Sequence, residues 1–211
     1  MDDIINQQLK LWRSEFGWQY AERNNNCIAA NDQRRLVRDW GKILTHAINP
    51  QPENALEIGC NIGRNILALR NLIADVRGIE PNQHAVEFAN KLFGKDKFPV
   101  QAGDGFNLPF DDNTFDLVFT SGVLIHVSPD DLKTMTNEIM RVSRQYIVCI
   151  EYFSHTPEQI SYHGKNGFLF KRDFGRFYLE HYQRLKVLDY GFLWQPFDSS
   201  DDSNWWLFEK I

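Results

Sequence analysis

Apolar side chains along the chain follow two different periods, which divide it into a helical start and an alternating remainder. Over residues 1–48 they recur every three or four positions, as at Trp12 and Phe16, and a polar stretch at 24–26 separates two expected helices. From Ala55 onward, short apolar runs of strand length alternate with longer runs whose apolar residues share one helix face. Such alternation predicts an α/β fold, a doubly wound sheet covered by helices.

The same pattern places the individual elements. Strands are expected at 55–58, 76–79, 99–102, 115–120, 145–151, 185–194 and 204–210, and helices at 32–48, 64–72, 128–142, 173–182 and after Pro81. We expect Ser128 to cap the helix at 128–142, with Pro129 in its first position. Residues 152–167 break the alternation and predict a polar, aromatic loop. The chain is expected to form a single domain, 1–211, with a helical segment at 1–48, a βα core at 54–151 and a C-terminal part at 152–211.

Composition excludes several classes of protein. The net charge is −5 and no lysine- or arginine-rich tract occurs, so nucleic acid is not an expected partner. No apolar run approaches the roughly 18 residues that cross a bilayer, and the N-terminus lacks a basic segment followed by an apolar one. Cys27, Cys60 and Cys149 stand far apart, without the spacing of zinc ligands. We therefore expect a cytoplasmic protein with no membrane association and no structural metal.

The loop after the first expected strand carries the clearest chemical signal. Residues 55–63 read Ala-Leu-Glu-Ile-Gly-Cys-Asn-Ile-Gly and lead into a helix, as in nucleotide-binding βαβ units. The dinucleotide pattern G-x-G-x-x-G would need glycine at Asn61 and Arg64, and the phosphate-binding pattern G-x-x-x-x-G-K-[ST] fails here too. A ligand that carries adenosine but no pyrophosphate remains, and S-adenosylmethionine is the obvious one.

Several residues around this loop are expected to contact that cofactor. Those in the loop itself are Glu57, Gly59, Cys60 and Gly63. The next strand ends on Glu80 and Pro81, a position from which a carboxylate can accept hydrogen bonds from both ribose hydroxyls. Simple turn geometry for the glycines and a solvated strand end for Glu80 are the alternatives.

Taken together, these elements resemble a class I S-adenosylmethionine-dependent methyltransferase over the whole chain. Four segments narrow the resemblance to the pseudaminic-acid-biosynthesis-associated methylases: WRSEFGWQYAERN (12–24), GVLIHVSP (122–129), LFKRDF (169–174) and DYGFLW (189–194). The resemblance implies a Rossmann-like sheet of seven strands whose last strand is antiparallel, a helical N-terminal lid, and an enzyme that transfers methyl groups. It leaves the acceptor undefined, because the family's name comes from association with a sugar pathway.

The resemblance also implies cofactor contacts beyond the first loop. Asp104 would accept a hydrogen bond from the adenine amino group, and Gly105 would permit a tight turn. The rival interpretation is that Asp104 only forms the turn. The residues expected beneath the reacting methyl group are Thr120, Ser121 and Gly122. The three-residue spacing itself places Tyr20 and Arg23 on one helix face, from which they could close over the sulfonium and pair with the cofactor carboxylate. A lid helix in which Tyr20 belongs only to the core is the alternative. Trp12 and Phe16 are expected only to pack.

His126 is the candidate base, because methyl transfer to a hydroxyl or an amine releases a proton and imidazole titrates near neutral pH. A histidine that only holds its loop is the alternative. Residues 151–172 concentrate aromatic and basic side chains, and those expected to contact the acceptor are Tyr152, Tyr162 and Lys171. An anionic or polyhydroxylated acceptor would suit such a wall, although a solvated surface would look the same in the sequence.

The leading hypothesis for function is an enzyme that methylates an oxygen or nitrogen of a small polar metabolite, such as a sugar or nonulosonic acid derivative. One alternative is a carboxyl or amine methyltransferase of a natural-product pathway. A second is a protein of the same fold that binds the cofactor or a nucleotide without turnover. A third, an oxidoreductase with an adenosine cofactor, is weakened by the missing glycines.

Overall fold

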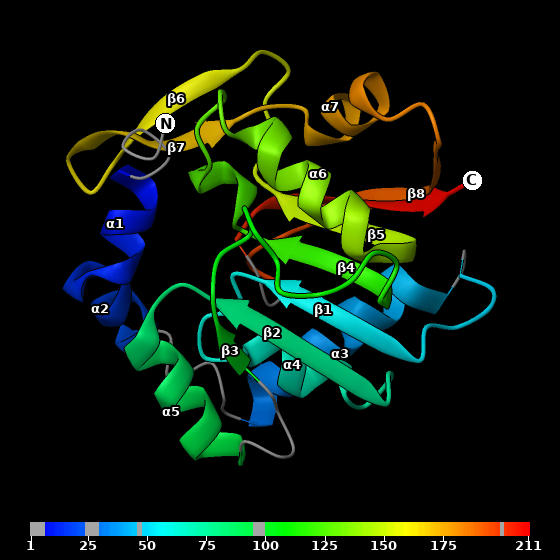
Figure 1. Cartoon of the computed structure of the whole chain (residues 1–211), viewed down its shortest axis with the longest axis horizontal. Helices are drawn as coiled ribbons and strands as arrows, with labels where there is room; N and C mark the ends of the chain where they lie inside the picture. Colours follow the sequence, from blue (N-terminus) through cyan, green and yellow to red (C-terminus); the bar gives the residue numbers. More distant parts are fainter. Residues whose placement is uncertain (1–6, 24–29, 46–47, 95–99, 199–200) are drawn as a thin grey trace.

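The structure contains the seven-stranded sheet that the resemblance implies. The computed structural model describes residues 7–23, 30–45, 48–94, 100–198 and 201–211. The strands of the main sheet are β1 (Asn54–Ile58), β2 (Asp75–Glu80), β3 (Val100–Ala102), β4 (Phe115–Ser121), β5 (Ser143–Glu151), β8 (Leu185–Leu193) and β9 (Ser203–Lys210). Their order is β3-β2-β1-β4-β5-β9-β8 (Figure 1). Strands β1 to β5 pair in parallel, and β9 runs antiparallel to both of its neighbours. The predicted doubly wound fold is confirmed.

Helices cover both faces of this sheet (Figure 1). On one face lie α3 (Ala30–Thr45), α4 (Arg64–Leu69) and α5 (Gln83–Phe93), and on the other α6 (Leu132–Val142) and α7 (Phe174–His181). Each face has its own apolar core, with Trp40 and Leu69 in the first and Met135 and Phe174 in the second. Four of the five residues of β1 are buried, because this strand lies between β2 and β4 and beneath helices on both faces.

The N-terminal segment forms two short helices where the sequence suggested one before the polar stretch. They are α1 (Gln7–Arg13) and α2 (Glu15–Arg23), and we call them the lid. The chain bends at Ser14, whose hydroxyl accepts a hydrogen bond from the Phe16 amide and so caps α2. Asn82, the N-cap of α5, donates to the carbonyls of Trp12 and Ser14 at 2.9 and 3.0 Å. The lid is thereby tied to the edge of the sheet where β2 ends.

The start of α6 differs from the predicted one. This helix begins at Leu132 with Asp131 as its N-cap, so Ser128 does not cap it. Instead, the Ser128 carbonyl accepts hydrogen bonds from the amides of Asp131 and Leu132 in a turn that contains Pro129. Proline is favoured both in the second position of a turn and in the first position of a helix, which explains the error.

Much of the predicted loop at 152–167 belongs to a hairpin, so that prediction was wrong. Its strands are β6 (Glu158–Tyr162) and β7 (Lys165–Lys171), which pair only with each other in the described part of the chain. The connecting residues, His163 and Gly164, have positive φ angles of 48° and 74°, as a two-residue hairpin turn requires. Most side chains of the hairpin are exposed or half-buried, so the sequence showed no clear apolar alternation.

Candidate active site

A cavity of about 530 Å³ lies at the carboxyl edge of the parallel strands. Its wall combines the loops after β1 to β4 with the lid, α3, the β6–β7 hairpin and four residues between β8 and the start of β9, Gln195, Asp198, Asp201 and Ser203. Neighbouring strands β1 and β4 mark the point at which the strand order reverses, where doubly wound sheets bind ligands. Most of the predicted site residues line this cavity. Those that do not are Arg23, Gly63, Thr120 and Lys171.

The glycine loop brings two strand ends close together. Gly59 and Gly63 have positive φ angles of 71° and 80°, which side chains disfavour. A Cβ on Gly59 would lie 2.7 Å from a methyl carbon of Val123, so a side chain there would push the loops after β1 and β4 apart. The amides of Gly59 and Cys60 both donate to the Ile79 carbonyl, at 2.8 and 3.1 Å. Gly59 and Cys60 line the cavity, whereas Gly63 lies behind it as the N-cap of α4.

Two buried carboxylates line the cavity beside this loop. Glu57 accepts a hydrogen bond from Asn65 at 2.7 Å through Oε1, while its buried Oε2 has no hydrogen-bond partner among the described residues. Burial raises the pKa of Glu57 to about 8. Glu80 accepts hydrogen bonds from the amides of Asn61 and Asn82 at 2.8 and 2.9 Å, and burial raises its pKa to about 7. A nearby cation or an additional donor would stabilise both ionised forms.

Asp104 is held by protein groups at both oxygens. Oδ1 accepts a hydrogen bond from the Phe106 amide at 3.0 Å and closes a turn, as the rival interpretation expected. Oδ2 pairs with Arg13 of the lid at 2.6 Å, a contact that the sequence gave no reason to expect. Gly105 is needed for space, because a Cβ there would lie 2.9 Å from a methyl group of Ile58. Asp104 therefore lines the cavity, forms a turn and contacts the lid.

Two of the three residues expected beneath the methyl group, at the end of β4, line the cavity. Ser121 and Gly122 line the cavity, and Gly122 has a φ of 66°. Thr120 is only 1% exposed and does not line the cavity, so the structure does not bring it to the site. Thr120 belongs to β4 itself and lies between its partners Ile58 and Cys149 on the two neighbouring strands.

His126 ends a short 3₁₀ turn that spans Leu124–His126. Its Nδ1 lies 2.6 Å from the Phe168 carbonyl oxygen, which can only accept, so Nδ1 carries the proton and Nε2 the lone pair. The structure records no hydrogen bond from a described residue to Nε2. Burial lowers the pKa of His126 to about 4, so the expectation of titration near neutral pH is wrong. A neutral ring with a fixed tautomer remains able to accept a proton.

Aromatic residues surround His126. Trp12 of the lid packs against the His126 ring, with ring centroids 4.8 Å apart, and against Tyr20 at 5.3 Å. Tyr162 of the hairpin contacts His126 at 4.9 Å. The structure thus brings the predicted residues Tyr20 and Tyr162 together. Trp12, which was expected only to pack, also lines the cavity.

The other predicted contacts have mixed outcomes. Tyr152 lines the cavity, and its hydroxyl donates to Asp201 at 2.7 Å. Arg23 is exposed, with its guanidinium carbon 5.8 Å from the Tyr20 ring centroid. Lys171 lines a separate cavity of about 200 Å³. The structure therefore does not place Arg23 or Lys171 at the main cavity.

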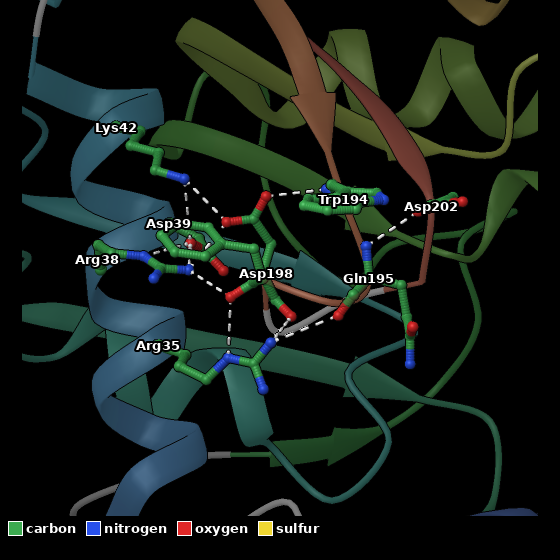
Figure 2. Close-up of polar contacts among 9 residues, drawn as sticks. Arg35, Arg38, Asp39, Lys42, Trp194, Gln195, Asp198 and Asp202 are labelled. Atoms are coloured by element: carbon green, nitrogen blue, oxygen red, sulfur yellow. Dashed lines mark hydrogen bonds and ion pairs between the residues drawn. The ribbon is translucent and has the colours of Figure 1, made fainter.

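One end of the cavity was missed by the sequence analysis. Figure 2 shows Arg35, Arg38 and Lys42 of α3 gathered around Asp198, which follows β8. The Oδ1 of Asp198 accepts hydrogen bonds from Arg38 and Lys42 at 2.9 and 2.8 Å. Arg35 donates to three backbone carbonyls within 195–198. Arg35 and Asp198 line the cavity, but these partners are more than 150 residues apart, and no local motif links them.

The described residues show neither a metal site nor a membrane segment. No group of three or more His, Cys, Asp or Glu among them is arranged to hold a metal ion. No helix in the described part of the chain is both long and apolar enough to cross a bilayer. Cys60 and Cys149 are free, buried thiols, and Cys27 lies outside the described residues.

Comparison with known proteins finds a family resemblance in the centre of the chain. Residues 56–150 match the sequence profile of the family described as "Methyltransferase domain". Over this stretch the chain is therefore similar to methyltransferases. The matched stretch runs from β1 into β5 and contains Glu57, Glu80, the glycine loop and His126.

The individual relatives are also methyltransferases, and their names give different methyl acceptors. The chain is 30% identical over 133 residues to an O-methyltransferase of Penicillium expansum, covering 60% of this chain and 45% of that protein. It is 25% identical over 160 residues to a sterol 24-C-methyltransferase of Pneumocystis carinii, covering 68% and 41%. The chain therefore spans less than half the length of these curated relatives.

A solved structure shares the fold over nearly the whole chain. It is the 1,6-didemethyltoxoflavin-N1-methyltransferase of Burkholderia thailandensis, with bound 1,6-didemethyltoxoflavin and S-adenosylhomocysteine. The TM-score is 0.71 at 15% identity, and the match covers 96% of this chain and 88% of that chain. The shared fold therefore extends well beyond residues 56–150.

Proposed function

We propose that this chain transfers a methyl group from S-adenosylmethionine to an oxygen or nitrogen atom of a small polar metabolite. The observation that carries the proposal is the pair of buried carboxylates, Glu57 and Glu80, at the ligand edge of a methyltransferase domain. Residues 1–211 would act as one unit, with the lid and the C-terminal part completing the cavity of the core.

The residues present fit a sulfonium cofactor. S-adenosylmethionine has two positive groups, the sulfonium and the α-ammonium, as well as two ribose hydroxyls. The unpartnered Oε2 of Glu57 is suited to accept a hydrogen bond from the ammonium group. The carboxylate of Glu80 at the end of β2 is suited to the ribose hydroxyls. Gly59, without a side chain, lets the backbone approach a ligand closely.

When bound, the cofactor supplies an electrophilic methyl group on sulfur, so the protein's contribution is alignment, exclusion of water and removal of a proton. The hydrogen bond from Nδ1 to the Phe168 carbonyl orients the His126 ring. Nε2 is then free to take the proton of a hydroxyl or amine acceptor. Trp12 and Tyr20 of the lid cover the cavity and keep water from the reacting groups.

The charges of the cavity wall favour an acceptor without negative charge. The described acidic residues that line it are Asp39, Glu57, Glu80, Asp104, Asp131, Asp198 and Asp201. Asp39 and Asp198 are already paired with Arg38 and Lys42, and Asp104 is paired with Arg13, whereas no ion pair is recorded for Asp131 or Asp201 among the described residues. The described basic residues that line the cavity are Arg35 and Arg64, and Arg35 already donates to backbone carbonyls. Lys171 lies outside. The family resemblance makes sugar and nonulosonic acid derivatives candidate acceptors, and an uncharged sugar derivative fits this wall better than a free carboxylate does.

The test starts with the protein as purified. Mass spectrometry should detect S-adenosylmethionine or S-adenosylhomocysteine, and calorimetry should give saturable binding of S-adenosylhomocysteine. Incubation with labelled cofactor and a panel of amino sugars, nonulosonic acids and small amines should then add one methyl group to an uncharged or cationic compound.

Three outcomes would change the proposal in different ways. Absence of S-adenosylhomocysteine binding would refute the assignment of S-adenosylmethionine as the cofactor. Binding without any methylated product would favour a non-catalytic protein of the same fold. Preferential methylation of a nonulosonic acid would refute the argument that the wall favours an uncharged acceptor, and would leave the proposed methyl transfer intact.

A further inference from the structure

Glu151, the last residue of β5, is fully buried and yet does not line the cavity. Its Oε1 accepts hydrogen bonds from the amides of Val123 (3.2 Å) and Leu124 (3.0 Å), and its Oε2 accepts one from the amide of Ile125 (3.3 Å). Three consecutive backbone donors thus converge on one carboxylate. The next residue in the chain is His126.

The loop that Glu151 holds reaches two walls of the cavity. It leaves β4 at Gly122, whose amide donates to the Ile150 carbonyl at 2.8 Å. Val123 comes so close to Gly59 that no side chain would fit between them. Three residues later, His126 contacts the lid and the hairpin. A single short loop therefore contacts the proposed cofactor wall at one end and carries the candidate base at the other.

A carboxylate has a specific advantage at this position. It offers two acceptor oxygens to three converging N–H groups, whereas a glutamine side chain offers one oxygen and an NH₂ group that would meet the donors head-on. The structure records these backbone contacts and no ion pair for Glu151 among its described residues, and burial raises its pKa to about 7. Because a buried, unpaired carboxylate lowers stability, packing alone would favour a neutral residue here.

We propose that Glu151 is a positioning residue for methyl transfer, fixing residues 123–126 so that Val123 and His126 hold their places against the two walls. This inference rests on the proposed function, because it needs His126 to act on the acceptor. Glu151 itself touches neither the cavity nor a reacting atom, and it acts only through the loop.

Glu151→Gln tests the inference, with Glu138→Gln as the matched control. Glu138 also accepts a hydrogen bond from a loop amide, that of Leu108 at 2.7 Å, but in a different loop. For each variant we would measure thermal stability, affinity for S-adenosylhomocysteine, and amide hydrogen exchange of the protein saturated with this ligand. Turnover would be measured with the panel compound that the wild type methylates.

In Glu151→Gln we expect amide exchange at 123–125 to rise at least about tenfold. Turnover should fall by about tenfold to a hundredfold, while affinity for S-adenosylhomocysteine stays within about threefold. Glu151→Asp keeps both oxygens and should recover part of the turnover, and it also serves if the glutamine variant does not fold. In Glu138→Gln, faster exchange should be confined to the Leu108 loop, and turnover should remain that of the wild type.

Wild-type turnover in a folded Glu151→Gln protein would overturn the inference. So would equal losses of stability, ligand affinity and turnover in the Glu151 and Glu138 variants, because Glu151 would then be a purely structural residue. Failure of the proposed function itself is distinguishable, because the wild type would not bind S-adenosylhomocysteine before any variant is compared.

Discussion

The two walls of the cavity are built in different ways. The wall proposed to hold the methyl donor, called here the donor wall, consists of the glycine loop with Glu57, Glu80 and Asp104. Its carboxylates are placed by strand ends of one parallel sheet. The wall proposed to hold the acceptor, called here the acceptor wall, surrounds His126 with aromatic residues from the lid and the hairpin, so it joins segments from distant parts of the chain. The donor wall is therefore part of the sheet, whereas the acceptor wall can change without changing the fold. Acceptor specificity should be encoded in the second wall.

Burial has a common effect on both walls. It raises the pKa of Glu57 to about 8 and that of Glu80 to about 7, and it lowers the pKa of His126 to about 4. Near neutral pH each of these groups is thus shifted toward its uncharged form. On the donor wall a cationic ligand would reverse the shift, while His126 stays neutral. The donor wall should accordingly respond to pH, and the acceptor wall should not.

The largest expected effect comes from removing the carboxylate of Glu80. Glu80→Ala should weaken binding of S-adenosylhomocysteine several hundredfold, because hydrogen bonds to a charged group contribute about 1.5–3 kcal/mol each. Calorimetry at pH 8 measures this, with Glu87→Ala, an exposed residue of α5, as the control. Undiminished binding in a folded Glu80→Ala protein would falsify the assignment of Glu80 to the ribose hydroxyls. The donor wall would then lose its main reason for being assigned to the cofactor.

Replacing the candidate base should affect the acceptor wall alone. His126→Ala should lower turnover about a hundredfold, the lower end for loss of a general base, while affinity for S-adenosylhomocysteine changes less than about threefold. The control is His155→Ala, at an exposed position outside the cavity. If turnover survives, His126 only holds the loop. If cofactor affinity falls equally, the two walls are not separable.

The same division explains what the sequence could predict. Glu57, Gly59 and Glu80 were found because a strand, a glycine loop and a second strand end form a local pattern with a known ligand edge. Trp12 could not be assigned to the cavity, because its neighbour His126 lies more than 100 positions away. Likewise, nothing local showed that Asp198 would meet α3, or that Lys171 would line a different cavity.

Long-range contacts also account for the remaining misses. The sequence indicates only that Glu151 ends a strand. Its role is hidden because the three amides that donate hydrogen bonds to it belong to residues 26 to 28 positions earlier. The lowered pKa of His126 follows from burial under the lid and the hairpin, which the pattern around residue 126 does not report. Element type was easier to predict than burial, because periodicity is local and burial is not.

Cofactor affinity should depend on pH through the donor wall. Glu57 and Glu80 have raised pKa values in the free protein, and their ionised forms bind a cation or hydroxyl donors, so affinity for S-adenosylmethionine should rise about tenfold from pH 6 to 8. Binding should release protons, which calorimetry in buffers of different ionisation enthalpy detects. Glu57→Gln should flatten the upper part of this profile. An affinity that falls with rising pH would contradict the assignment.

Stability of the ligand-free protein should show the opposite trend. Glu57 and Glu80 have folded-state pKa values above those of an unfolded chain, so the folded state binds more protons between about pH 5 and 8. The free energy of unfolding should fall as pH rises through that window, and the melting temperature should be higher at pH 6 than at pH 8. A melting temperature that increases over this range would show that the pKa values of the two carboxylates are not raised in the folded protein.

The smallest expected effect concerns the contact by which the lid meets the donor wall. Arg13 pairs with Asp104 at 2.6 Å, but its side chain is 51% exposed, and exposed ion pairs contribute only about 0.2–1 kcal/mol. Arg13→Ala should therefore leave the melting temperature nearly unchanged and alter affinity for S-adenosylhomocysteine less than about twofold. Asp104→Ala also removes the hydrogen bond to the Phe106 amide and a wall carboxylate, and should cost about tenfold in affinity. Equal effects of the two variants would mean that the ion pair, and with it the lid, helps to hold the cofactor, so that the two walls act as one.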